Sequence, residues 1–268
     1  MPSNSMTSWW PFPPWTREVQ CDEKWAFVGK KEKQCRADDP ADAQRGDNWD
    51  HVAYDPEHRL VLSVVPGKRT VENTELLVQD FQARTGQRTL DLITTDEYPA
   101  YRTALLNAYG QTVIPPRTGK PGRPRRAYQV PPPNLRYATV HKTRRKGRVV
   151  KIDLRVVFGE VAAVQAALER SAVSHTINTA FVERHNGTDR NRNARKTRKS
   201  YCFSKDWDIH NAATYFTMYS YNFCWPVRTL RRHDDGRWHP RTPAMSAGLT
   251  DHVWSLAEWL TFPAVQPP

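Results

Sequence analysis

The order of apolar patterns between residues 17 and 114 restricts the possible folds more than any other feature of this 268-residue chain. Residues 17–31 alternate between apolar and polar side chains, which predicts a strand, and 49–67 predict two strands joined by a turn at Asp55-Pro56. A helix, a short strand, a second helix and another short strand follow. This order predicts an α/β fold in which helices flank a mixed five-stranded sheet.

The two helices and the last strand can be placed by their end signals. The first helix is expected over 70–86, where Thr70 or Asn73 can cap its start. Its expected apolar face consists of Leu76, Leu77, Val78 and Phe81. The second helix is expected over 99–110, between a proline and a glycine. The segment 111–116 then supplies the fifth strand.

Composition divides the whole chain into five segments. Residues 1–16 are expected to form a flexible tail, and 17–114 form the first part of the core. A basic insertion that contains a β-hairpin is expected over 115–158, because its first half is rich in proline, glycine and arginine. The helical remainder of the core follows over 159–225. Residues 226–268 are expected to form a tail that packs on the core.

Positive charge is concentrated in two places. The chain has a net charge of +12, from 40 Lys and Arg against 28 Asp and Glu. Between residues 115 and 151 there are twelve Lys and Arg and no acid, and between 183 and 199 there are seven against two acids. Because a merely solvated surface intersperses both signs, this clustering indicates a polyanionic partner such as nucleic acid.

Cysteine usage and hydropathy argue against secreted and membrane proteins. Cys21, Cys35, Cys202 and Cys224 form no C-x-x-C pair and no zinc-ligand spacing, which is typical of reduced thiols in a cytosolic protein. The sequence has no run of 18 or more apolar residues, so no membrane span is predicted. The aromatic, proline-broken N-terminus lacks the basic leader of a secretory signal. A cytoplasmic location is expected.

Three acids occupy positions from which they can meet. Asp22 lies within the first expected strand, Asp96 at the carboxyl end of the fourth, and Glu183 near the start of a later helix. Sites of open α/β sheets lie at the carboxyl ends of strands, and carboxylates suit the paired Mg²⁺ ions that promote phosphodiester chemistry. The alternative is that each acid is a turn or capping residue, since any triple can be chosen from 28 acids.

Three stretches in order resemble DDE transposases, and most closely those of the insertion-sequence-one family: "VQCDEKWAFVGKK", "LITTDEYPAY" and "FVERHNGTDRNRNARKTRKSYCFSKD". The resemblance covers roughly 17–225. It implies a ribonuclease-H-like core in which Asp22, Asp96 and Glu183 bind two Mg²⁺ ions, for which Mn²⁺ can substitute. Many such enzymes carry a basic residue seven positions after the glutamate, and Arg190 stands there.

The resemblance also implies a function and partners. The expected activity is cleavage and strand transfer of DNA ends, performed on double-stranded transposon ends and target by a homo-oligomer in the bacterial cytosol, at the nucleoid. Two alternatives stay open. The chain can be a ribonuclease-H-like nuclease without strand transfer, or an inactive DNA-binding relic of a transposase.

Two features depart from the family's pattern. Glu97 follows Asp96 where the family often has glycine, and it is a candidate extra ligand, although strand alternation would point it the other way. Only about 16 residues precede the first expected strand, and no zinc-ligand pattern occurs. The DNA-binding module usual in the family is therefore expected from an upstream frame, joined by ribosomal frameshifting, unless this copy is truncated.

The basic segments supply the expected DNA contacts. The tip of the hairpin is expected near Lys146-Gly147, and phosphate contacts there would supply affinity without sequence information. About half of the basic residues after Glu183 are expected to face DNA, because their spacing spreads them around a helix. His185 and His210 are candidates for structural roles. The expected DNA-binding residues are Arg144, Arg145, Lys146, Arg148, Arg184, Asn186, Arg190, Arg192, Arg195, Lys196, Arg198 and Lys199.

Overall fold

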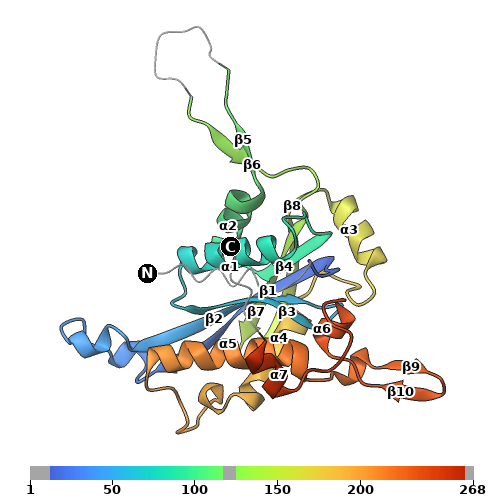
Figure 1. Ribbon diagram of the computed structural model, residues 1–268. Helices are drawn as coiled ribbons and strands as arrows, with labels where there is room; N and C mark the ends of the chain where they lie inside the picture. The colour runs from blue at the N-terminus through green and yellow to red at the C-terminus, as the bar shows by residue number, and fades with distance from the viewer. Residues whose placement is uncertain (1–12, 117–124, 263–268) are drawn as a thin grey trace.

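A computed structural model describes residues 13–116 and 125–262 of the chain. These residues form an α/β fold around a six-stranded mixed sheet whose strand order is β3-β2-β1-β4-β7-β8 (Figure 1). The strands are β1 (Glu18–Val28), β2 (Gly46–Asp55), β3 (Leu60–Gly67), β4 (Leu92–Asp96), β7 (Tyr137–Arg145) and β8 (Arg148–Phe158).

Strand direction brings three carboxyl ends to one edge of the sheet. β1, β2 and β3 are joined antiparallel, whereas β1 runs parallel to β4, and β4 runs parallel to β7. In the β1–β4 ladder Gln20 pairs with Thr94. The same register continued two residues beyond this last pair places Asp22 beside Asp96, the last residue of β4. The parallel strands β1 and β4 therefore bring Asp22 and Asp96 to the same edge of the sheet.

Helices cover both faces of the sheet. Figure 1 shows α1 (Val71–Arg84) and α2 (Ala100–Tyr109) on one side, and α4 (Ala180–Arg192) and α5 (Trp207–Cys224) on the other. The first pair packs on the odd-numbered residues of β1, with Val19 and Cys21 in the same buried cluster as Leu77 and Tyr101. The even-numbered face of β1 is thereby turned toward α4. The short helix α3 (Val161–Arg170) covers Leu92 and Ala138.

Most of the expected elements are confirmed. Thr70 caps α1 by accepting from the Asn73 amide, and Gly86 takes a φ of +67° just after the helix. Leu76 was wrongly expected on the buried face, because its side chain is 53% exposed. The helix expected after residue 180 ends at Arg192 and is followed by a single 3₁₀ turn, Ala194–Lys196.

The fifth strand of the sheet was predicted wrongly. The segment after α2 forms only β5 (Gln111–Val113), which pairs with β6 (Tyr128–Val130) in a separate two-stranded ribbon. Two prolines follow it, and proline cannot donate to a ladder. The place beside β4 is taken by β7, whose first four residues, 137–140, are buried. The expected hairpin is thus β7–β8, and it is part of the sheet, which raises the strand number to six.

The ends of the described chain pack on this core. Thr16 is buried and donates to Asp55, so residue 16 is ordered rather than part of a flexible tail, whereas residues 1–12 lie outside the described residues. Trp254 and Trp259 pack against the core, the latter from α7 (Leu256–Thr261). Two short elements, α6 (Pro243–Ser246) and the ribbon of β9 (Arg232–Asp234) and β10 (Arg237–His239), precede them. Residues 117–124 of the basic segment also lie outside the described residues. Among the helices that the structure describes, none has the length and apolar character needed to cross a membrane.

Candidate active site

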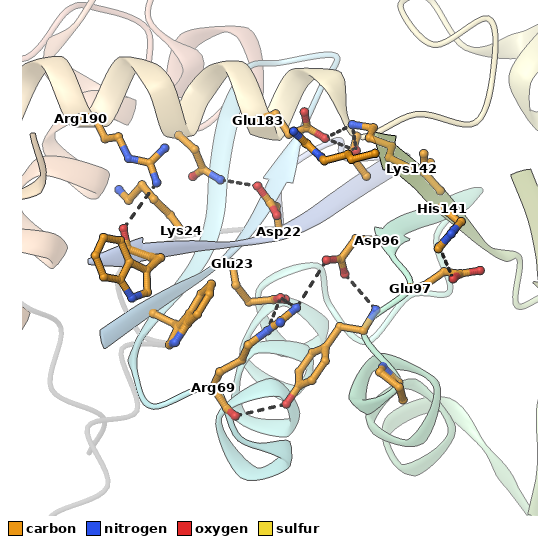
Figure 2. Close-up of a pocket in the computed structure, with 18 of the residues that line it drawn as sticks. Asp22, Glu23, Lys24, Arg69, Asp96, Glu97, His141, Lys142, Glu183 and Arg190 are labelled. Carbon is orange, nitrogen blue, oxygen red and sulfur yellow. Dashed lines mark hydrogen bonds and ion pairs between the residues drawn. The ribbon is translucent and has the colours of Figure 1, made fainter. Parts of the chain in front are cut away.

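Asp22, Asp96 and Glu183 line one cleft of about 780 Å³ at the carboxyl edge of the central strands (Figure 2). Asp22 comes from the even-numbered face of β1, and Asp96 is the last residue of β4. Glu183 lies in the first turn of α4, which packs across β1. The three acids predicted from the sequence are therefore brought together, although they are far apart along the chain.

Each acid already has a hydrogen-bond or ion-pair partner. The Asn186 amide, from α4, donates to Asp22 of β1 over 2.8 Å. The backbone amide of Tyr98 donates to Asp96 over 3.0 Å, and the Arg69 guanidinium lies 3.5 Å from the same carboxylate.

Glu183 is held by a second basic residue. The hydroxyl of Thr179, at the N-terminal end of α4, donates to its carboxylate over 2.6 Å. Lys142, from β7, forms an ion pair with the same oxygen. The aliphatic parts of the cleft are few, and its walls are mostly charged or aromatic side chains.

The carboxylates disfavour one another's charge. Burial, together with repulsion from Asp96 and Glu183, raises the pKa of Asp22 to about 6, although the hydrogen bond from Asn186 lowers it. Burial and then the charge of Asp96 raise the pKa of the neighbouring Glu23 to about 7, against the lowering influence of Arg69. Carboxylates that repel one another across a cleft are stabilised when a divalent cation binds among them.

The carboxylates of the cleft have the chemistry that a magnesium-type ion requires, but two basic side chains pair with them. Within the described residues, no three His, Cys, Asp or Glu side chains converge closely enough to hold an ion as they stand. Arg69 pairs with Asp96 and Lys142 pairs with Glu183, and both cations would have to release these acids for an ion to bind. Carboxylate oxygens are the hard ligands that Mg²⁺ prefers. The buried Oδ1 atom of Asn186, which has no partner among the described residues, is a further oxygen donor at the same point.

Two further acids near the cleft have other partners. Glu97 lies 2.6 Å from His141 and 3.8 Å from Arg155, on the side of the strand end away from Asp22 (Figure 2). This is the direction that strand alternation predicts. Glu23 forms an ion pair with Arg69 over 2.8 Å. Arg69 is a cleft residue that sequence reasoning missed, because nothing in the sequence around it indicates that the loop after β3 reaches the ends of β1 and β4.

The expected DNA-binding residues divide into several groups. Arg144, Asn186, Arg190 and Arg198 line the cleft together with the acids. Arg145, Lys146 and Arg148 are exposed at the turn of the β7–β8 hairpin, where Lys146 and Gly147 have φ values of +49° and +78°. Arg195 and Lys199 are exposed beyond the end of α4. Arg184 and Arg192 lie on a different face of α4, where they line another groove.

Lys196 was wrongly expected to contact DNA. Its ammonium group is buried and forms an ion pair with Asp50 of β2. Lys24 of β1 is also fully buried, and it pairs with Asp189 of α4 and lies 3.2 Å from Asp50. These four residues, called here the buried charge cluster, tie α4 to β1 and β2. Lys24 and Asp50 carried no sequence signal, since a charged strand residue ordinarily indicates an exposed face.

His185 and His210 have structural roles. His210 contacts Ser204 and Asn48 over 2.8 and 3.1 Å in the interior. His185 lies between two aromatic rings, with centroids 4.8 Å from Tyr54 and 4.7 Å from Tyr221. Burial lowers the pKa of His185 to about 3. The ring is therefore neutral where it packs.

Acid is expected to destabilise the protein through His185. Its folded pKa of about 3 lies below the ordinary value of 6.5, so the unfolded state binds more protons between those values. The neutral ring makes its full contribution to the free energy of unfolding above pH 6.5, and this contribution is lost as the pH falls toward 3. At pH 5 the expected loss relative to pH 7 is on the order of 2 kcal/mol.

The substitution His185→Phe keeps the aromatic packing and removes the titration. It is expected to flatten the dependence of the free energy of unfolding on pH between 7 and 5, measured by urea denaturation. The matched control is His175→Gln, at an exposed histidine, which should leave the slope unchanged. An equal slope in the parent and in His185→Phe would contradict the assignment.

No protein-family model, no curated protein and no solved structure matches the chain. The features that indicate a function are therefore the order of the strands, the cleft that the three acids share and the charge around them.

Proposed function

We propose that the chain is the catalytic domain of a DDE transposase of the insertion-sequence-one type, which cleaves DNA ends and joins them to a target with two Mg²⁺ ions. The observation that carries the proposal is the meeting of Asp22, Asp96 and Glu183 in one cleft, from three separate elements, in the order in which the sequence motifs occur. In an inactive relic of a transposase, the three acids would not need to line the same cleft.

The sheet supports the finer fold assignment in this proposal, a ribonuclease-H-like core. Three antiparallel strands, β1 to β3, are followed by two strands that extend the sheet on the other side of β1 in parallel. The first acid lies on the central strand, the second ends the next strand, and the third lies on a helix that covers one face. This arrangement is what the motif order implies for such a core.

The surroundings of the acids support DNA as the substrate. Arg190 lies two helical turns after Glu183 and therefore on the same side of α4, with its guanidinium directed toward the Trp25 carbonyl at 3.5 Å. Arg144 and Arg198 add positive charge to the walls of the cleft. Such side chains position a phosphate backbone without reading its sequence.

The chain's own residues would divide the work as follows. Asp22 and Asp96, with Glu183 completing the site, would hold the two ions, which activate the attacking oxygen and stabilise the leaving oxygen when bound. Asn186 fixes the carboxylate of Asp22 by its hydrogen bond. Arg144, Arg190 and Arg198 would bind the phosphates on either side of the scissile bond. Water is the first attacking group, and the freed 3′-OH attacks the target strand in the second reaction.

The proposal includes partners and a place of action. A homo-oligomer on DNA would hold two DNA ends together, and a DNA-binding module encoded upstream would read their sequence. The work is expected in the bacterial cytosol, on nucleoid DNA.

A joining assay tests the function. Labelled pre-cleaved ends, taken from the DNA that flanks this coding sequence, are incubated with the protein and a supercoiled plasmid. Covalent joining is expected with Mg²⁺ or Mn²⁺ and none with EDTA, measured on denaturing gels. Cleavage without joining would assign the chain to the nucleases. Binding with neither reaction would make it a relic.

A further inference from the structure

A second groove, of about 280 Å³, lies on the other side of α4 from the catalytic cleft. Phe181, Arg184, Thr188 and Arg192 of α4 line it, together with the β2–β3 turn and the segment after α5. Glu183, Asn186 and Arg190 line the cleft instead. At about 100° per residue, the two sets of positions project roughly half a turn apart, so α4 separates the two cavities.

The second groove is positively charged. Four of its lining residues are arginines, and none of the described residues that line it is an acid. Within the described part of the chain, none of these guanidinium groups forms an ion pair, in contrast to Arg69 in the cleft. The four residues, called here the arginine groove, are Arg59, Arg184, Arg192 and Arg228. Their charge is therefore uncompensated by the protein.

Aromatic rings hold two of these guanidinium groups in place. Arg59 lies over Phe181, 4.2 Å from the ring centroid. Arg192 lies 4.2 Å from the ring of Trp225 and 5.1 Å from that of Tyr221. Cation–π attraction of this kind helps to fix the two guanidinium groups. Groups fixed before binding lose less entropy when a ligand arrives.

The backbone at Arg59 has an unusual conformation beside the groove. Arg59 has a φ of +56°, in the left-handed region that non-glycine residues rarely adopt, at the turn between β2 and β3. Glycine or asparagine would relieve the strain there. The chain instead has an arginine whose side chain reaches the groove.

We infer that the arginine groove binds the phosphate backbone of a second DNA duplex while the first lies in the catalytic cleft. Guanidinium groups bind phosphate by paired hydrogen bonds, and no carboxylate of the described lining residues would oppose a polyanion. The cleft and the groove lie about half a turn apart on α4, so one straight duplex seated in the cleft would have to cross the helix to reach the groove, whereas a second segment of DNA reaches it directly. The inference rests on the proposed function, since the cleft is taken as the site of the first duplex.

The number of duplexes bound per protomer tests the inference. Sedimentation velocity at low salt, with a short dye-labelled duplex, is expected to show one more duplex per protomer for the parent than for the double variant Arg184→Ala/Arg192→Ala. The slope of log K against log salt concentration should fall in magnitude by about 2, because two phosphate contacts are lost. Both residues are exposed, so the variant should stay folded, and its temperature of thermal unfolding should fall only slightly because Arg192 loses its contacts with Trp225 and Tyr221.

Two further variants separate this inference from the proposed function. Arg102→Ala/Arg170→Ala removes the same charge from exposed positions on α2 and α3 and should keep the parent's number of duplexes. Glu183→Gln should lose Mg²⁺-dependent cleavage and keep both duplexes, whereas the arginine-groove variant should keep cleavage of the DNA in the cleft. A parent without cleavage that still binds the extra duplex would refute only the proposed function.

Two results would overturn the inference. The first is an equal number of duplexes for the parent and for the arginine-groove variant. The second is a parent that binds no extra duplex but binds polyglutamate through Arg184 and Arg192, which would assign the groove to an acidic protein.

Discussion

Replacing Asp96 by Asn is expected to lower Mg²⁺-dependent cleavage and strand transfer by about 10³-fold or more. Metal ions contribute several kcal/mol to phosphodiester transition states, and each 1.36 kcal/mol corresponds to a factor of about ten in rate. The amide keeps the shape of the side chain and removes its charge. Asp22→Asn and Glu183→Gln should show losses of the same order, measured as initial rates on labelled DNA ends.

Loss of activity should occur without loss of folding. The charge of Asp96 raises the pKa of both Asp22 and Glu23, so removing that charge relieves repulsion, and the variant is expected to unfold at no lower temperature than the parent. Duplex binding should persist, because Arg144, Arg190 and Arg198 still line the cleft.

The matched control is Glu97→Gln. Glu97 is the next residue in the chain and lines the same cleft, but its carboxylate is paired with His141. This variant should stay within a few-fold of the parent's rate. Full activity in Asp96→Asn, or a loss in Glu97→Gln as large as that in Asp96→Asn, would contradict the assignment of the three acids.

The sequence predicted the fold where one face of an element is apolar and the other is polar. That pattern located β1 to β4 and both flanking helices, because side-chain burial follows the period of each element. It failed at the fifth strand. β7 has four buried residues followed by exposed basic ones, so its composition resembles that of an insertion. Pairing with β4 is a long-range contact that no local pattern of this strand indicates.

The sequence also predicted the acids of the site better than the cations around them. The motifs gave Asp22, Asp96 and Glu183, whose meeting the sheet order makes possible. Arg184 and Arg192 were grouped with Arg190 because all three are basic, although the helical period separates their faces. Lys196 was placed on DNA for the same reason. Whether a lysine is buried depends on partners remote in the chain, and its partner Asp50 is 146 residues away.

Replacing Lys24 by Met is expected to lower the free energy of unfolding by about 3–5 kcal/mol, the usual cost when one partner of a buried ion pair is removed. Among the described residues, Asp189 would keep the hydroxyl of Thr217, 3.0 Å away, and Asp50 would keep Lys196. Burial alone would raise the pKa of Asp50, but Lys196 and Lys24 lower it. Urea denaturation measures the loss.

A double variant distinguishes a missing partner from a poor fit of the methionine. Lys24→Met/Asp189→Leu removes both charges of one pair, so no carboxylate of that pair is left buried alone, and part of the stability should return. Lys33→Met, at an exposed lysine, should change stability by less than about 0.5 kcal/mol. A Lys24→Met variant within that limit would show that the buried charge cluster contributes little.

The same variant links the interior to the cleft. Lys24 and Asp22 lie on the same face of β1, and their partners Asp189 and Asn186 lie one turn apart on α4. The Lys24–Asp189 ion pair and the Asn186–Asp22 hydrogen bond therefore both fix α4 against β1. Loss of the Lys24–Asp189 ion pair should let α4 shift and displace Glu183 from Asp22 and Asp96. At a temperature where Lys24→Met is still folded, strand transfer should therefore fall more than duplex binding. The double variant Lys24→Met/Asp189→Leu should regain more of the parent's stability than of its strand-transfer activity.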